Sequence, residues 1–306
     1  MLVVPAYAKV NLALEVTRLR PDGWHDIASV VTTVDWHDLV GIGLRCGGPA
    51  AGPPVRLRIS GPFAEGIPAD GTNLAVRAAA ALLSHGGGDL AFDIWLGKNV
   101  PAAAGLGGGS ADAAAVLRAG SALLGAAGKA QAPDTQHLVA AAEALGSDVP
   151  ALLAGGTLMV TGRGELLEPL PSPQLHLAIA VAAPSMTAAA YGALHDDERR
   201  GDGRAARLAA ALQHPQGPTT IDHATLGSAL EAPAVRAAPG LADALRRLRA
   251  ATPDHTWHLT GSGGAAFSIA ATRQQAEHLA ATARAEGFPA RACRTVTPRL
   301  GPLAPP

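Results

Sequence analysis

The chain has 306 residues, of which 48% are hydrophobic and 16% are charged, a balance typical of a well-packed globular protein and not of a disordered one. The formal net charge of −1 gives no reason to expect general binding to nucleic acid or to a membrane surface. Two cysteines, Cys46 and Cys293, do not suggest a disulfide-stapled domain or a zinc site. The first residues contain neither a basic leader nor a long apolar run, so we expect a cytoplasmic protein.

Strands and helices alternate in the first half of the chain. Val10, Leu12 and Leu14 alternate with polar or small residues, which is strand periodicity. The strands predicted in this way cover 7–17, 27–44, 55–60 and 90–97, and a hairpin covers 156–168 around the turn GRGE. Three helices are predicted. The first is capped by Thr72 or Asn73 and ends near Ser84, and the other two cover 110–124 and 133–145.

A linker is predicted near residue 170, where the sequence reads LEPLPSPQ, and it divides the chain into domains 1–168 and 169–306. The elements expected beyond it are a strand at 175–182, a helix from Thr187, a polar irregular stretch at 196–218, helices at 220–231 and 240–251, a strand pair around TGSGG, a helix at 273–286, a strand at 289–296 and a frayed tail, PRLGPLAPP. Strands that come first, with helices interleaved, favour an α+β fold over a repeating βα array.

Four glycines fall within the five positions from Gly105 to Gly109, between a predicted strand and a predicted helix. Backbone N–H groups can converge there because no Cβ keeps a ligand away, and the positive end of the helix dipole favours an anion. The alternative is a flexible turn that happens to be rich in glycine. The loop is not a Walker A loop, since no Lys-Ser or Lys-Thr pair closes it, and its glycine spacing is not that of a dinucleotide fold. We therefore predict a phosphate-binding loop of another type.

Two charged residues are candidates for chemistry beside such a loop. Lys9 lies two residues from Asn11 in a predicted strand, so both side chains project from one face. A lone lysine on a strand is usually solvated, but near a phosphate it can hold the γ-phosphate or acidify an acceptor hydroxyl. Asp148, in GSDVP, is equally well explained as a helix N-cap.

The glycine loop reads P-x-x-x-G-L-G-G-G-S, from Pro101 to Ser110, and in this form it resembles the central motif of the GHMP kinases. The opening AYAKVNLALEVTRLRPDGWHDIASV is similar to the signature of one branch, the 4-diphosphocytidyl-2-C-methyl-D-erythritol kinases. LGSDVPALLAGGTLMVTGRGE and LTGSGGAAFSI match two later elements of that family, so the resemblance covers nearly the whole chain. It implies a two-domain α+β fold, with an N-terminal domain like the second domain of ribosomal protein S5 and a ferredoxin-like C-terminal domain.

The resemblance implies an ATP-dependent kinase that phosphorylates the 2-hydroxyl of 4-diphosphocytidyl-2-C-methyl-D-erythritol in the non-mevalonate isoprenoid pathway. In this assignment Asp148 accepts the proton of the acceptor hydroxyl, with Lys9 beside it. Trp24, where the family usually has tyrosine, stacks on the cytosine opposite Tyr191, and His25 reads the polar edge of the base. The implied substrate-binding residues are Asn11, Trp24, His25, Thr187 and Tyr191.

The resemblance also implies ATP as the cofactor. Mg²⁺ is expected through the ATP phosphates, with Ser110 as an additional ligand and no metal-binding set of its own. Gly261 to Gly264 resemble a loop that approaches the phosphates from the second domain. The implied ATP-binding residues are Asn73, Leu74, Lys98, Pro101, Ala102, Ala103, Ala104, Gly105, Leu106, Gly107, Gly108, Gly109, Ser110 and Ala111.

The sequence departs from the family at two places and leaves other functions open. Ala102 to Ala104 replace residues that are commonly glycine or methionine, and Ser228 stands where the family often has asparagine, so its contact is in doubt. Another kinase of the superfamily, acting on homoserine or a mevalonate derivative, would not need the aromatic set. A nucleotide-binding protein without kinase activity would not need both catalytic candidates. The oligomeric state is not predicted.

Overall fold

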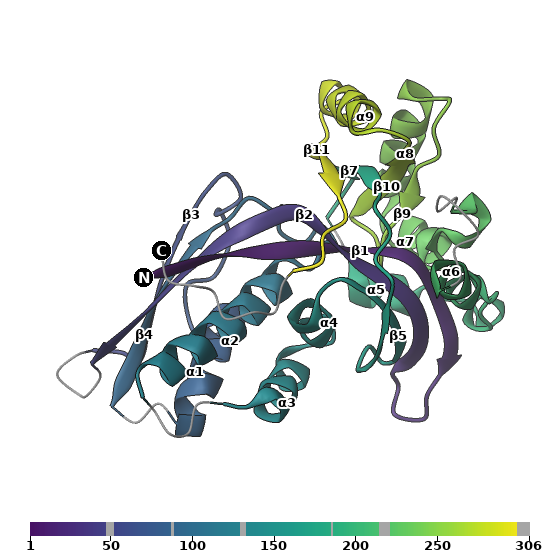
Figure 1. The fold of residues 1–306 in the computed structure, drawn as a ribbon. Coiled ribbons are helices and arrows are strands. Elements are labelled where there is room, and N and C mark those ends of the chain that lie inside the picture. The colour runs from purple at the N-terminus through teal and green to yellow at the C-terminus, as the bar shows by residue number, and fades with distance from the viewer. Residues whose placement is uncertain (47–51, 87–88, 129–132, 185, 214–220, 299–306) are drawn as a thin grey trace.

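The computed structural model describes residues 1–46, 52–86, 89–128, 133–184, 186–213 and 221–298, and within them the strands form two sheets (Figure 1). Seven strands form the first sheet, in the order β3-β4-β2-β1-β8, with β5 beside β2 and β6 beside β5. The bounds of these strands are β1 Leu2–Leu19, β2 His25–Cys46, β3 Val55–Ser60, β4 Leu90–Gly97, β5 Thr157–Gly162, β6 Leu166–Leu170 and β8 Gly227–Ser228. The two long strands β1 and β2 run antiparallel across the molecule and connect its two halves.

Four helices of the first half pack with this sheet. Their bounds are α1 Leu74–Gly86, α2 Gly108–Ala126, α3 Thr135–Leu145 and α4 Val149–Ala154. The small alanine side chains of α2 let the sheet, α1 and α4 pack closely against this helix, and most of these alanines are therefore buried. At Gly120 even a methyl group would lie 2.5 Å from the Leu82 side chain, so this contact needs a glycine. The alanine-rich run thus forms the buried centre of the first half.

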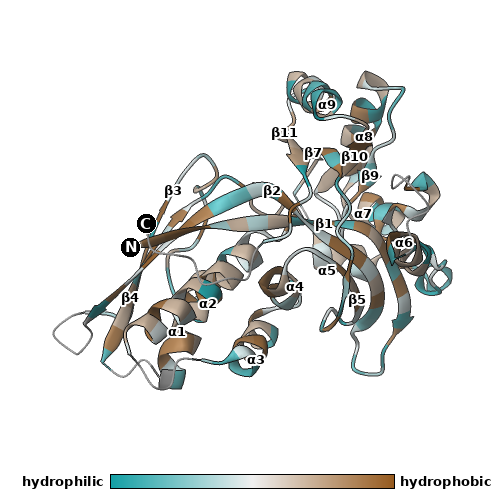
Figure 2. Cartoon of the chain, viewed as in Figure 1, coloured by the Kyte–Doolittle hydropathy of each residue, from teal (hydrophilic) through white to brown (hydrophobic). Residues whose placement is uncertain are grey.

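The second sheet has the order β11-β7-β10-β9 and is antiparallel throughout. Its apolar face packs against α8 and α9 through leucines and alanines, whereas the outer side of α9 carries hydrophilic residues (Figure 2). The bounds of the elements in this half are β7 His176–Val181, α5 Thr187–Gly192, α6 Arg204–Gln213, α7 Glu231–Ala237, α8 Pro239–Ala251, β9 His258–Leu259, β10 Ala265–Ala270, α9 Arg273–Ala285 and β11 Ala290–Arg294.

The predicted α+β fold is confirmed, and most predicted elements are present within a few residues of their expected bounds. The prediction of an irregular stretch at 196–218 is wrong over 204–213, which is α6, and a 3₁₀ turn covers Asp196–Arg199. The N-terminus of α6 is capped by a residue far away in the sequence. The Glu15 carboxylate accepts hydrogen bonds of 2.7 Å from the backbone N–H groups of Asp202, Gly203 and Ala205. Positions 214–218 and the predicted frayed tail beyond residue 298 lie outside the described residues.

The prediction of one helix at 220–231 is also wrong. Only a 3₁₀ turn at His223–Thr225 precedes β8, and α7 begins at Glu231. Gly227 has a φ of 94° and pairs with Ala13 of β1 in parallel register, which ends any helix there. A strand from the second half of the chain therefore completes the first sheet. The first part of the predicted linker is strand β6, and the division at 168 and 169 stays a prediction.

In the part of the chain that the structure describes, no helix combines the length and the apolar character needed to cross a bilayer.

Candidate active site

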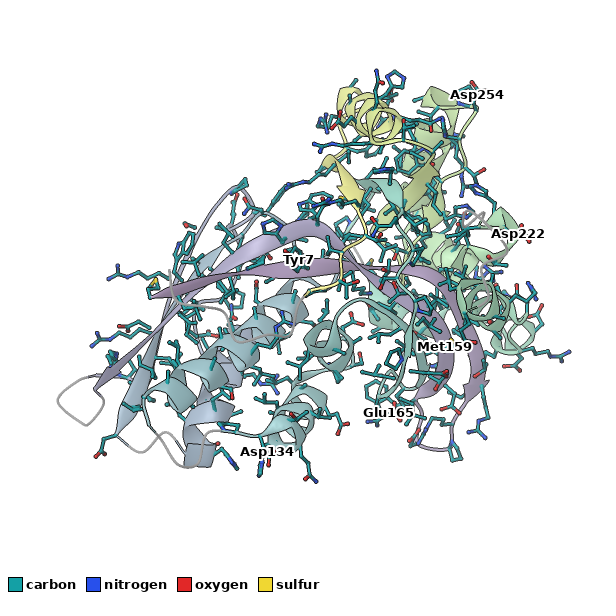
Figure 3. All side chains as sticks on the ribbon, viewed as in Figure 1. Tyr7, Asp134, Met159, Glu165, Asp222 and Asp254 are labelled. Carbon is teal, nitrogen blue, oxygen red and sulfur yellow. The ribbon has the colours of Figure 1, made fainter. Side chains whose placement is uncertain are left out.

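A cleft of about 780 Å³ opens between the two halves of the molecule. The hairpin of β5 and β6, marked in Figure 3 by Met159 and Glu165, closes one side of it, and α5 closes another. Both predicted catalytic residues and all five predicted substrate-binding residues line this one cleft, although they come from distant parts of the sequence. The predicted residues in its walls are Lys9, Asn11, Trp24, His25, Gly105, Asp148, Thr187, Tyr191, Gly261 and Ser262.

Lys9 and Asp148 form an ion pair at the base of the cleft. Lys9 Nζ lies 3.4 Å from Asp148 Oδ2 and donates a 2.8 Å hydrogen bond to Asn11 Oδ1. Lys9 is buried, whereas the Asp148 side chain is 45% exposed. Asp148 occupies the N-cap position of α4, but its side chain makes no capping hydrogen bond. The capping explanation of this aspartate is therefore wrong, and its carboxylate faces the cleft beside a buried ammonium.

Asn11 connects the first strand to the late glycine loop. Its backbone N–H donates to Thr260 Oγ1 at 2.8 Å, and its side-chain amide donates to Ser29 Oγ at 2.8 Å. Ser228, whose contact the sequence left in doubt, donates its hydroxyl to the Gly261 carbonyl at 2.6 Å. Both halves of the chain thus fix the floor of the cleft through buried polar groups.

The two glycine-rich loops interlock backbone against backbone. A Cβ on Gly105 would lie 2.4 Å from the Gly263 carbonyl oxygen, and one on Gly264 would lie 2.7 Å from the Ala104 carbonyl oxygen. Both glycines have φ values in the left-handed region, at 75° and 97°. Only glycine fits these positions without displacing the opposite loop. Part of the glycine cluster is therefore explained by packing and not by a ligand.

The start of α2 is the part of the loop that suits a phosphate. The helix begins at Gly108, because Gly107 takes the left-handed N-cap conformation, and no side chain caps the first turn. The prediction that Ser110 opens this helix is therefore wrong. A Cβ on Gly109 would meet no atom within 4 Å, so space remains over these N–H groups. An uncapped helix N-terminus with open space beside it fits an anion.

Asn73 and Leu74 do not line the cleft. Asn73 caps α1, accepting from the Ala75 N–H at 2.9 Å and donating to the Pro68 carbonyl at 2.7 Å. Leu74 packs against the core of the first half. Of the other predicted ATP-binding residues, Gly105 lines the cleft, and Ala102, Ala103 and Gly109 are exposed. The nucleotide site stays a prediction.

Lys98 lies in a buried charge cluster behind the glycine loop. Its ammonium donates to Asp38 and, at 2.6 Å, to Asp112, and it is 2% exposed. Asp38 also accepts the backbone N–H groups of Asn99 and Val100, which anchors the chain that leads into the loop. Burial raises the pKa of Asp112 to about 7; the Lys98 charge opposes this shift and that of Asp38 adds to it. The geometry supports Lys98 as an internal cation that holds the loop in place.

The aromatic residues are arranged as two separate contacts. The rings of His25 and Tyr191 lie 5.1 Å apart at 37°, whereas Trp24 is 58% exposed and the Arg163 guanidinium lies over its indole, 5.1 Å from the centroid. Thr187 exchanges a 2.7 Å hydroxyl hydrogen bond with Ser262. Stacking of cytosine between Trp24 and Tyr191 stays a prediction.

Burial controls the titration of both inner rings. Burial, and then the charge of Asp148, raises the pKa of Tyr191 to about 12, so its hydroxyl is a hydrogen-bond donor at neutral pH. Burial, and then the charge of Arg199, lowers the pKa of His25, so its imidazole is neutral there. His25 Nε2 is buried and has no hydrogen-bond partner in the structure. A neutral imidazole in this place can exchange a hydrogen bond with a polar ligand edge.

Several residues of the cleft were not predicted from the sequence. Arg163, in the turn of the hairpin, and Arg199, at the end of the 3₁₀ turn, both line it. Ser29 and Thr260 hold Asn11 from opposite sides. The turn GRGE predicts a hairpin, but a hairpin turn alone does not predict the direction of its arginine side chain.

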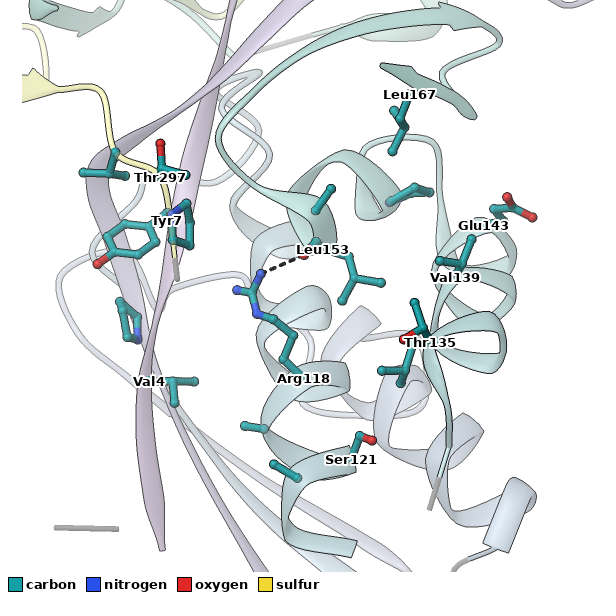
Figure 4. A pocket seen from close by; sticks show the side chains of 18 of the residues that line it. Val4, Tyr7, Arg118, Ser121, Thr135, Val139, Glu143, Leu153, Leu167 and Thr297 are labelled. Atoms are coloured by element: carbon teal, nitrogen blue, oxygen red, sulfur yellow. Dashed lines mark hydrogen bonds between the residues drawn. The ribbon is translucent and has the colours of Figure 1, made fainter. Parts of the chain in front are cut away.

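A second cavity, of about 1060 Å³, lies on the other side of α4 (Figure 4). Its walls come from β1, α2, α3 and α4 and are mostly apolar. Arg118 lies inside and donates from one nitrogen to the carbonyl oxygens of Leu152 at 2.9 Å and Leu153 at 3.2 Å, near the end of α4. No predicted site residue lines this cavity, so the larger of the two cavities is not the one where the predicted chemistry gathers.

The two-sheet fold, with its lysine, aspartate and interlocked glycine loops, defines a GHMP kinase, and residues 73–156 match the family model of the GHMP kinases N terminal domain. The chain is 37% identical over 292 residues to the 4-diphosphocytidyl-2-C-methyl-D-erythritol kinase of Paracoccus denitrificans, covering 92% of this chain and 91% of that protein. It is 35% identical to the enzyme of the same name from Gloeobacter violaceus, covering 95% and 93%. A crystal structure of 4-(cytidine 5'-diphospho)-2C-methyl-D-erythritol kinase superposes with a TM-score of 0.75 at 31% identity, covering 96% of this chain and 99% of that chain. The chain therefore belongs to the family of 4-diphosphocytidyl-2-C-methyl-D-erythritol kinases, as the sequence motifs indicate.

Proposed function

We propose that this protein transfers the γ-phosphate of ATP to the 2-hydroxyl of 4-diphosphocytidyl-2-C-methyl-D-erythritol, in the non-mevalonate pathway to isoprenoid precursors. The observation that carries the proposal is the single cleft that holds both the Lys9–Asp148 pair and the aromatic residues. The relatives that bear this name support the substrate. A homoserine or mevalonate kinase would have no use for the aromatic end of the cleft.

At the acceptor end, Asp148 is the general base. Its partly exposed carboxylate can reach a hydroxyl that enters the cleft and take its proton as the new O–P bond forms. Lys9 holds that carboxylate in place, with its Nζ 3.4 Å from Asp148 Oδ2. Because the Lys9 ammonium is buried, its field is poorly screened and also acts on negative charge that develops on the transferred phosphoryl group.

At the cytidine end, His25 and Tyr191 supply hydrogen bonds and an aromatic wall. The unpartnered Nε2 of His25 suits the polar edge of a base, and the exposed Trp24 offers its free ring face for stacking. Asn11 and Thr187 complete the substrate-binding set between the two ends.

At the nucleotide end, the N–H groups of the first turn of α2 bind the ATP phosphates, supported by the uncapped helix start and the open space at Gly109. We propose that Mg²⁺ would enter with the nucleotide, bound through the ATP phosphates. Ser110, in the same turn, would be its protein ligand, and Mg²⁺ would supply charge neutralisation on the phosphates. A cytoplasmic location belongs to this proposal as well.

The test is ATP turnover by the purified protein with Mg²⁺, comparing the cytidyl substrate with homoserine and mevalonate. We expect turnover with the cytidyl substrate alone. Asp148→Asn keeps the size of the side chain and should lower kcat by about 10²–10⁴-fold with little change in KM. Trp24→Ala should raise KM for the cytidyl substrate. Phosphorylation of homoserine in preference, or an Asp148→Asn variant with normal kcat, would refute the proposal.

A further inference from the structure

We propose that Arg163 and Arg199 bind the diphosphate that joins the cytidine and methylerythritol parts of the substrate. The inference rests on the proposed function and adds two residues to it. Three cations line the cleft, Lys9, Arg163 and Arg199, whereas Asp148 is the one carboxylate among its described lining residues. This excess of positive charge stands out in a chain whose net charge is −1, and it suits an anionic ligand.

Arg163 is arranged to hold an anion. Its guanidinium lies over the Trp24 indole, and within the described residues no carboxylate approaches it to ion-pair distance. No side-chain hydrogen bond or ion pair engages the Arg163 guanidinium within the described residues, so a cation–π contact with Trp24 leaves its N–H donors available. Arg163 therefore presents unused donors beside the place proposed for the cytosine.

Arg199 lines the cleft from the end of the 3₁₀ turn, a different segment from the hairpin that carries Arg163. Its two terminal nitrogens donate to Asp196 and, at 2.9 Å, to the Leu194 carbonyl, which orients the side chain. Its Nε is buried and has no hydrogen-bond partner in the part of the chain that the structure describes. Asp196 is almost fully exposed, so water screens it, while the charge of Arg199 is felt at His25. Arg199 thus brings a positively charged, incompletely bonded group to the inner end of the cytidine site.

Both arginines lie beside residues proposed to bind the cytidine, to which the diphosphate is attached. Arg163 lies over Trp24 and the charge of Arg199 acts on His25, while Lys9 and Asp148 form a separate pair at the proposed acceptor end. Lys9 is already bonded to Asn11 and paired with Asp148, so it cannot by itself balance two phosphates. Arginine suits this task because its donors match phosphate oxygens in pairs.

The competing interpretation is that Arg163 only supports the Trp24 ring. Calorimetric titration with cytidine, CMP and CDP separates the two, because only the phosphorylated ligands need the arginines. We expect wild-type protein to bind CDP more tightly than cytidine, and Arg163→Gln to reduce that preference about tenfold while the Kd for cytidine stays unchanged. Arg199→Gln should act in the same direction. Arg200→Gln is the matched control, since Arg200 is exposed and does not line the cleft.

If Arg163→Gln lowers the affinity for cytidine and for CDP equally, Arg163 only supports the Trp24 ring and the inference is overturned. An unchanged preference for CDP would also overturn it. If Arg199→Gln does not fold because its bond to Leu194 is lost, Arg163→Gln still decides the question. A wild-type protein that binds neither cytidine nor CDP refutes the proposed function itself. If wild-type protein binds CDP and neither arginine substitution changes its Kd for CDP, only this inference is refuted.

Discussion

Replacing Gly105 with alanine tests the interlocking of the two glycine loops. The φ of 75° at this position costs an L-residue roughly 1–2 kcal/mol. The new Cβ would also lie 2.4 Å from the Gly263 carbonyl oxygen, and moving one loop away costs about 1–3 kcal/mol more. We therefore expect Gly105→Ala to lower the free energy of unfolding by about 2–5 kcal/mol. Urea unfolding followed by circular dichroism measures this change.

Gly109→Ala is the matched control in the same loop. Its φ lies outside the left-handed region and its new Cβ meets no atom within 4 Å, so the free energy of unfolding should stay the same or rise by up to about 1 kcal/mol. The same methyl group would project where we propose the ATP phosphates, so KM for ATP should rise. A Gly105→Ala variant as stable as Gly109→Ala would refute the reasoning, because the two loops would then not be in close contact.

Three further changes test other parts of the structure. The pKa of Asp112 rises from 3.8 to about 7 on folding, so its contribution to stability is present at low pH and is lost between about pH 4 and pH 7. The free energy of unfolding of wild type relative to Asp112→Asn should therefore fall over this same range, and a constant difference in urea unfolding would contradict the shift. Arg118→Ala removes the hydrogen bonds to the end of α4 and should lower the free energy of unfolding by about 1.5–3 kcal/mol in the same assay. It should also lower kcat, because α4 begins beside the proposed base. Arg118→Lys should recover part of both losses. Ser228→Ala should cost about 1–3 kcal/mol, because the Leu230 N–H and the Gly261 carbonyl lose a buried partner, and an unchanged thermal midpoint would exclude this role.

Short-range sequence patterns were sufficient to predict the helices and strands whose formation depends on neighbouring residues. The alternation of Val55, Leu57 and Ile59 with arginines predicted β3, and glycines mark the ends of α1 and of the β5–β6 hairpin. The motifs also predicted that Lys9, Asp148 and the aromatic residues meet in one place, because they match a family whose members share the fold. These features depend on neighbours in the chain or on a conserved order of motifs.

The missed features depend on contacts between distant segments. Helix α6 was read as irregular although Ala205, Leu208 and Leu212 have helical spacing, since its cap, Glu15, lies in β1. The start of α2 was placed at Ser110 because serine is a common cap, whereas the conformation of Gly107 decides it. The family resemblance assigns Lys98 to the ATP site, which stays a prediction, but nothing in its own neighbourhood in the sequence predicts its contact with Asp38 of the adjacent strand β2.

The bond between Asn11 and Thr260, across 249 positions, has a consequence for the time at which the protein becomes an enzyme. A ribosome that adds about 5–20 residues per second needs roughly 10–50 s to pass from the first of these residues to the second. During that interval the helices and most strands of the first sheet can form, but β8 and the late glycine loop do not yet exist. Lys9 and Asp148, the proposed catalytic pair, are thus synthesised early, whereas the loop that holds Asn11 beside Lys9 is synthesised late. A nascent chain therefore contains the pair before the floor of its cleft is complete.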